Sequence, residues 1–167
     1  MSDQLLSIQK LLHTKDIQSY YWPMNAERKL AKLVIEIQTT DTESNHLEIC
    51  EIPVPNSEVF LLQFFVQLPL IEPFGPDDAL PEFLQGNLHM YIGALNQILP
   101  LTGFNCADGK ICFRHIFSCE LVTPEQLLYL IETIERLVQI CQPSIQQVAI
   151  GIQDSKTAIR DINALFI

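Results

Sequence analysis

The sequence predicts an α+β fold in which helices pack on one antiparallel sheet. Stretches of alternating apolar residues are grouped between stretches in which apolar residues recur every three or four positions, and short turns join consecutive strands. An Asp-Gly pair at Asp108-Gly109 is also typical of a two-residue hairpin turn. The 167 residues fit a single domain, 1–167, with the order α-β-β-β-α-β-β-α and an additional C-terminal helix.

The N-terminal part, residues 1–30, is expected to hold one helix and an aromatic connector. Apolar residues recur near helical spacing over Ser2–His13, which predicts a short amphipathic helix. The connector Tyr20-Tyr21-Trp22-Pro23-Met24 follows, and its proline disfavours a helical conformation for Trp22. We interpret these aromatic residues as a lid on the core, with a partner contact as the alternative.

Residues 31–142 are expected to form the main core. The predicted elements are strands at Leu33–Gln38, Leu47–Ile52 and Val59–Leu68, a helix at Pro81–Leu99, and hairpin strands at Phe104–Ala107 and Lys110–Leu121. Each strand is predicted from alternating apolar residues, and the helix from a broad apolar face. Pro53 and Pro55 end the second strand because proline cannot donate a hydrogen bond to a neighbouring strand.

The start of the last long helix is predicted residue by residue. Thr123 can cap the helix, Pro124 suits its first position, and Gln126 completes a capping box. Pro143 is expected to break or kink this helix. Residues 143–167 then form a C-terminal helical extension, with an amphipathic stretch over Ala158–Phe166.

The charge is strongly negative and unevenly distributed. Twenty Asp and Glu against ten Lys and Arg give a formal charge of −10, which argues against binding to nucleic acid or to anionic membranes. Between Leu33 and Gly109 there is no Lys or Arg, and that interval carries a formal charge of −11. We interpret it as a solvated acidic surface, with attraction of a basic partner as the alternative.

The sequence lacks the motifs of the common catalytic and metal sites. It contains no phosphate-binding loop, dinucleotide-binding turn, zinc-binding helix or nucleophile elbow, and its four histidines show no paired spacing. Asp77 and Asp78 are adjacent acids in a proline-rich loop, and we interpret them as a lead-in to the next helix rather than an acid/base pair. We therefore expect no enzyme activity, no cofactor and no metal.

The cysteines and the first residues of the sequence indicate in which cellular compartment the protein is expected. The five cysteines include no Cys-x-x-Cys pair, and Cys106 and Cys112 should lie on opposite faces of the hairpin. Free, buried thiols fit a reducing compartment. The start of the chain has no basic segment before its apolar residues, and no stretch is long and apolar enough for a membrane span. We therefore expect a cytoplasmic protein.

One stretch of the sequence resembles a known family. It reads Leu88-x-x-Tyr91-x-x-x-Leu95-Asn96-x-x-Leu99-Pro100-x-x-Gly103-Phe104-x-x-x-Asp108-Gly109-x-Ile111-x-Phe113-Arg114. Together with Thr123-Pro124-Glu125-Gln126-Leu127 and the order of elements, it resembles the bacterial YbjN family of sensory-transduction regulators. The resemblance covers roughly Lys32–Cys141 and implies a fold like that of type III secretion chaperones, which are small acidic homodimers that hold stretches of a partner protein. It implies no catalytic residues.

The leading hypothesis is a non-enzymatic protein-binding module, homodimeric, in a chaperone-like or regulatory role, with an unidentified partner protein for which a basic charge is one alternative. The candidate surface for the partner or the dimer consists of Leu84, Leu88, Tyr91 and Leu95, of Asp77 and Asp78, and of Ile159, Ile162 and Phe166. Two alternatives stay open. One is a structural subunit of a larger assembly, tethered by its C-terminal helix. The other is a small-ligand protein with a pocket under Tyr20, Tyr21, Trp22 and Phe74.

Overall fold

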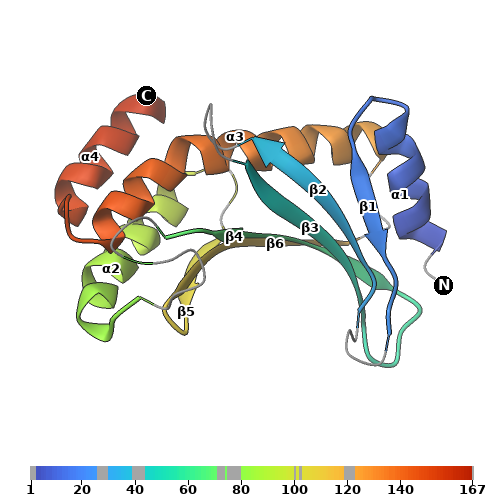
Figure 1. Cartoon of the computed structure of the whole chain (residues 1–167), viewed down its shortest axis with the longest axis horizontal. Helices are drawn as coiled ribbons and strands as arrows, with labels where there is room; N and C mark the ends of the chain where they lie inside the picture. The colour runs from blue at the N-terminus through green and yellow to red at the C-terminus, as the bar shows by residue number, and fades with distance from the viewer. Residues whose placement is uncertain are drawn as a thin grey trace. The chain divides into compact units, whose positions relative to one another are not determined.

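The computed structural model of the chain describes residues 3–25, 30–38, 44–70, 74, 80–99, 101, 103–118 and 123–166. The predicted α+β class is confirmed, with a six-stranded antiparallel sheet in the order β1-β2-β3-β4-β6-β5 (Figure 1). The strands are β1 Ser19–Trp22, β2 Lys32–Gln38, β3 Ser44–Pro53, β4 Phe60–Leu68, β5 Phe104–Ala107 and β6 Lys110–Ser118. The helices are α1 Asp3–His13, α2 Glu82–Ile98, α3 Pro124–Ala149 and α4 Ser155–Phe166.

The structure adds one strand to the predicted order. Ser19–Trp22, which includes the first three residues of the predicted connector, forms β1 and pairs antiparallel with β2. Aromatic residues favour strands, and this short segment gains its partner from a part of the chain that lies ten or more residues away. The prediction of an irregular connector is therefore wrong up to Trp22.

The chain forms two compact units, each built from segments that are distant in the sequence. The first comprises Met1–Val66 and His115–Glu135, and the second comprises Gln67–Arg114 and Arg136–Ile167. Strands β4 and β6 and helix α3 each contribute residues to both units.

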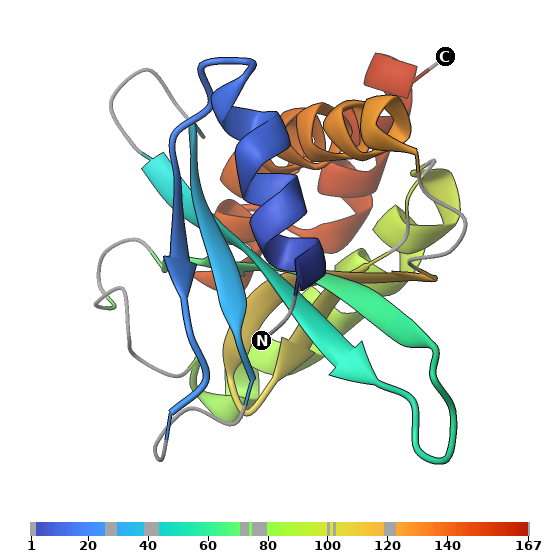
Figure 2. The same cartoon turned by 90° about the vertical axis from the view of Figure 1, so that its right-hand side faces the viewer.

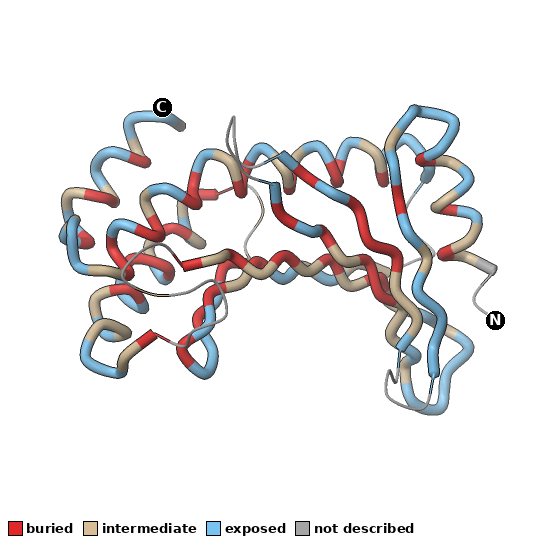
Figure 3. Tube along the Cα trace, in the orientation of Figure 1, coloured by how far each residue is buried: buried red, intermediate tan, exposed pale blue. Residues whose placement is uncertain are grey.

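The first unit buries one face of its strands under helices. Leu33 lies opposite Ile49, Ile49 lies opposite Phe64, and none of the three exposes any surface to solvent. Helix α1 contacts β1, β2 and β3 and buries Leu5 and Leu12 completely (Figure 2). Buried and exposed residues alternate along β3 and recur along α1 (Figure 3). The alternating residues Leu33, Ile35 and Ile37 of β2 are all buried.

The second unit is organised around α2, which contacts β5 and α4. Tyr91 is buried and its hydroxyl donates a hydrogen bond of 2.8 Å to Ser144 Oγ on α3. The side chain of Asn96 receives hydrogen bonds from the backbone of Gly103 and Phe104 and so joins the end of α2 to β5. The predicted hairpin is confirmed, with positive φ at both of its turn residues.

The ends of α3 and α4 show which capping predictions were correct. Thr123 and Gln126 form the predicted reciprocal capping box. Of the break or kink predicted at Pro143, the break is wrong, because α3 continues to Ala149; the kink stays a prediction. Cys141, Gln142 and Ile145 beside this proline are buried, and their packing offsets the lost backbone hydrogen bond. Helix α4 begins at Ser155, and hydrogen bonds from its Thr157 lower the pKa of the capping Asp154.

Candidate functional site

The predicted partner surface lies largely inside the second unit. Leu88, Tyr91 and Leu95 have no solvent exposure, and Ile162 is also buried. Leu84 and Ile159 are half-buried. Asp77 and Asp78 lie outside the described residues, as does the side chain of Phe166. The apolar face of α2 therefore packs within its own unit.

The three residues of the predicted aromatic pocket that lie on β1 do not share one face of the sheet. Tyr20 and Trp22 point to one face of the sheet and Tyr21 points to the other, because side chains alternate along β1. Phe74 belongs to the second unit. Of the four, Tyr20 alone lines a hollow that the structure describes.

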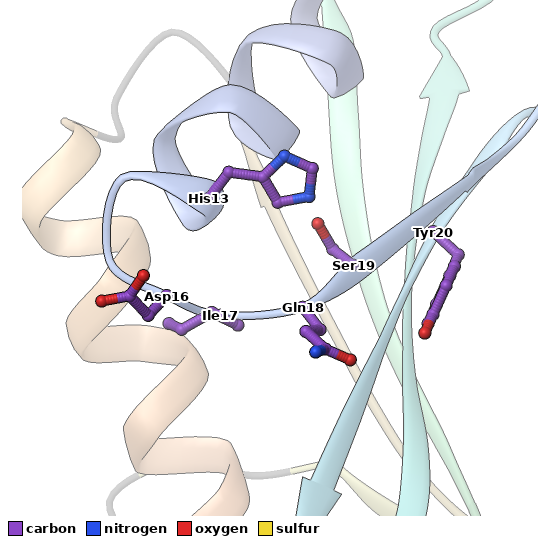
Figure 4. A pocket seen from close by; sticks show the side chains of 6 residues that line it. All are labelled: His13, Asp16, Ile17, Gln18, Ser19 and Tyr20. Carbon is purple, nitrogen blue, oxygen red and sulfur yellow. The ribbon is translucent and has the colours of Figure 1, made fainter.

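That hollow lies where α1 ends and β1 begins, with a volume of about 630 Å³ (Figure 4). It is lined by His13, Asp16, Ile17, Gln18, Ser19 and Tyr20. The end of α1 shapes it, since Ile17 N donates to Leu12 O at 3.0 Å and Asp16 N donates to His13 O at 3.2 Å. These two bonds form a Schellman motif, in which Asp16 takes a left-handed conformation with φ 57°.

Ser19 is the buried polar residue of this hollow. Its side chain is 6% exposed, and its Oγ has no hydrogen-bond partner among the described residues. Its backbone oxygen accepts a hydrogen bond of 3.0 Å from Gln9 Nε2. Figure 4 shows the hydroxyl directed to the side of the hollow where the His13 ring lies. A buried hydroxyl without a partner lowers stability and can be compensated by a ligand.

The other face of the sheet in the first unit carries exposed apolar residues. A small cavity lined by Ile8 and Leu11 of α1, Leu62 of β4 and Leu127 of α3 places both helical segments on the buried face. The opposite positions form what we call the open face: Tyr20, Trp22, Lys32, Glu36, Glu48, Leu61, Phe65 and Ile116, with the buried Val34 and Cys50 among them. Tyr20 is 57% exposed and Trp22 is 43% exposed. Aromatic residues at such a position are typical of protein interfaces.

A charged residue is held at the edge of the open face. Lys32 forms a salt bridge with Glu48, and its Nζ lies 4.9 Å from the centre of the Trp22 ring. Such a cation–π contact contributes about 0.5–1 kcal/mol at an exposed site. Burial, and secondarily the charge of Glu48, raises the pKa of the neighbouring Cys50 thiol. The open face thus combines aromatic surface with a neutralised ion pair and a protonated thiol.

The exposed side of α2 forms a second surface, in the second unit. Phe83, Gly86, Met90, Gly93 and Gln97 are all exposed, and they follow one another at alternating steps of three and four residues. We call this stripe the α2 seam. It lies opposite the buried residues of the helix. Apart from the chain neighbours and the backbone of α2 itself, no heavy atom of the described residues lies within 4 Å of a Cβ built on Gly86 or Gly93. Each glycine nevertheless weakens a helix by about 1 kcal/mol relative to alanine.

The titratable groups do not form a reactive centre within the described residues. Burial raises the pKa of the Cys106, Cys112 and Cys141 thiols, the last to about 12, so these thiols stay protonated near neutral pH. In the part of the chain that the structure describes, no group of His, Cys, Asp and Glu is arranged to hold a metal ion. None of the described helices is long and apolar enough to cross a bilayer.

Comparison with known proteins leaves the family open. A scan of family models, a search of curated proteins and a search of solved structures each found no match to this chain. The resemblance to the YbjN family therefore stays a prediction. Sequence reasoning missed the open face because it depends on β1, and the α2 seam because glycines do not contribute to an apolar pattern.

Proposed function

We propose that the protein is a non-enzymatic protein-binding module with a chaperone-like or regulatory role, and that it holds its partner on the open face. One observation carries the proposal: exposed Tyr20, Trp22 and Ile116 lie with Leu61 and Phe65 on a sheet face that the helices of the first unit do not cover. Exposed apolar residues that are gathered on one surface mark interaction sites more often than scattered ones do.

Charge supports a partner segment that is both apolar and basic. Glu48 pairs with Lys32, whereas Glu36, on the same face of β2, has no ion-pair partner among the described residues. The sequence from Leu33 to Gly109 has acids and no Lys or Arg. Complementary charge raises the association rate and orients the partner, while the aromatic residues supply the affinity.

The test uses Trp22, the one tryptophan in the chain, as a reporter. The full-length protein is used to select binders from a library of displayed random peptides, and an enriched peptide is synthesised and titrated. We expect enriched peptides to combine apolar residues with Lys or Arg. We also expect the emission of Trp22 to shift to shorter wavelength on binding, because the peptide removes water from the ring.

Two matched variants locate the binding surface. Ile116→Glu puts a charge on the open face, and Tyr129→Glu puts one on an exposed position of α3 in the same unit. We expect the first to weaken peptide binding by at least about tenfold and the second to leave it unchanged. Failure to select any peptide, or equal binding by both variants, would contradict the proposal.

A small-ligand function is the second candidate, because Ser19 Oγ is buried without a partner beside the hollow at the end of α1. A thermal-shift screen of metabolites tests it. A ligand of this hollow raises the melting temperature of the wild type and has less effect on Ser19→Ala. A screen without any stabilising compound argues against this function.

We further propose a cytoplasmic location. Cys50, Cys106, Cys112 and Cys141 are all free, as expected in a reducing compartment. Fractionation of host cells, with thiol labelling under denaturing conditions, tests this directly. Recovery of the protein outside the cytoplasm, or with oxidised thiols, would contradict it.

A further inference from the structure

We infer that the α2 seam binds the α2 seam of a second copy of this chain, with the two helices antiparallel. The seam carries two large apolar side chains, of which Phe83 is 83% exposed and Met90 is 61% exposed. Between these large residues lie Gly86 and Gly93, whose missing side chains leave open space. Large residues and gaps thus alternate along one line of the helix.

The spacing makes this surface complementary to itself. The two-fold axis would cross the exposed side of α2 at the height of Leu88, which is the midpoint between Phe83 and Gly93. Each residue then lies opposite the residue equally far on the other side of position 88, so Phe83 meets Gly93 of the second copy. In the same register Met90 meets Gly86 of the second copy. Each large side chain then enters the gap left by a glycine, as knobs enter holes in antiparallel helix pairs. This match between the two halves of one helix is why we assign the surface to a second copy.

Charge also favours a second copy at this surface. Two chains that each carry a formal charge of −10 repel each other. A close contact between them is therefore favoured where no acidic side chain of one copy faces an acidic side chain of the other. Phe83–Ala107 is the longest stretch of the sequence without Asp, Glu, Lys or Arg, and the α2 seam lies within it. Interface centres in known complexes are likewise poor in charged residues and enriched in Phe and Met.

The size of the surface sets the expected affinity. A helix of 17 residues is about 25 Å long, and one helix pair buries less area than most stable interfaces. We therefore expect a dissociation constant in about the micromolar range. This inference concerns the second unit and does not depend on the proposed partner site, so each can fail without the other.

The experiment measures mass by sedimentation equilibrium from about 1 to 300 μM, a range that brackets the expected constant. The wild type should pass from the 19.0 kDa monomer to a dimer of about 38 kDa, which is twice that mass. Gly86→Met fills the gap that receives Met90, and it should leave the protein monomeric over this range. The exchanged variant Gly86→Met/Met90→Gly restores a large residue opposite a gap, and it should dimerise again.

The exchanged variant has the same composition, charge and summed helix propensity as the wild type, so its recovery separates packing at the seam from general changes. Gly86→Met has open space for its side chain and should fold, which circular dichroism verifies. Leu165→Ala removes an exposed apolar residue of α4 in the same unit and should not change the mass. A monomeric wild type, a dimeric Gly86→Met or a monomeric exchanged variant would each overturn the inference.

Discussion

The buried phenol of Tyr91 should make the protein sensitive to alkali. Tyr91 has no solvent exposure and donates its proton to Ser144 Oγ at 2.8 Å. Burial raises the pKa of this phenol from 10.0 to about 12, because the ionised form would lose its hydration. The folded protein therefore keeps the proton in a pH range where the unfolded chain releases it.

The sign and size of the effect follow from this difference in pKa. Below pH 10 both states hold the proton, and Tyr91 contributes no pH dependence to the free energy of unfolding. Between pH 10 and pH 12 the unfolded chain releases the proton first, so stability falls by up to about 1.4 kcal/mol per pH unit. The whole shift corresponds to a loss of roughly 3 kcal/mol once the pH exceeds the folded pKa.

The matched variant is Tyr91→Phe, measured by urea unfolding with a thiol reductant at several values between pH 8 and pH 11.5. At pH 8 the variant should be less stable by about 1 kcal/mol, because it loses the hydrogen bond to Ser144. At pH 11.5 it should be the more stable protein, since it has no phenol to ionise. Groups common to both proteins, such as Cys141, cancel in the comparison. A difference in stability that stays constant with pH would refute the reasoning.

Three further substitutions test individual parts of the fold, each by thermal and urea unfolding. Asp16→Gly should stabilise the protein by about 0.5–1 kcal/mol, because glycine adopts the left-handed conformation at the end of α1 without strain, and an unchanged melting temperature would contradict this. Thr123→Ala removes a cap of α3 and should lower stability by about 1 kcal/mol, whereas full stability would mean that the capping box contributes nothing. Phe64→Ala should lower the free energy of unfolding by about 3–5 kcal/mol, because the ring is fully buried and packs edge-on against Phe117, with the ring centres 6.0 Å apart. A loss below about 1 kcal/mol would mean that the Phe64 ring does not contribute to the core.

The parts of the fold that the sequence predicts are those with a local cause. The alternation along Val59–Leu68, the Asp-Gly turn and the Thr123 capping box each depend on residues that are neighbours in the chain. Strand β1 was missed because its four residues become a strand only by pairing with β2. The break predicted at Pro143 does not occur, and α3 continues through this proline, where Ser144 accepts a hydrogen bond from the distant Tyr91.

The candidate surface was harder to predict than the fold. Helical spacing correctly identified Leu88, Tyr91 and Leu95 as one apolar face, but it could not say whether that face covers its own core or a partner. The structure shows that it covers its own core. What remains exposed is the opposite side, where Gly86 and Gly93 carry no signal on a hydropathy scale and become informative only when the space around them is known.

The uneven charge noted in the sequence separates the two proposed surfaces. The open face has Glu36 beside the neutralised pair of Lys32 and Glu48, whereas the α2 seam has no charged residue. Salt screens attraction to a basic partner, so it should weaken binding at the open face. Salt also screens the repulsion between two chains that each carry −10, so it should strengthen contact at the seam. Binding at the open face should therefore weaken with ionic strength, while dimerisation through the α2 seam should strengthen. If the partner protein and the second copy used the same surface, the two affinities would not change in opposite directions.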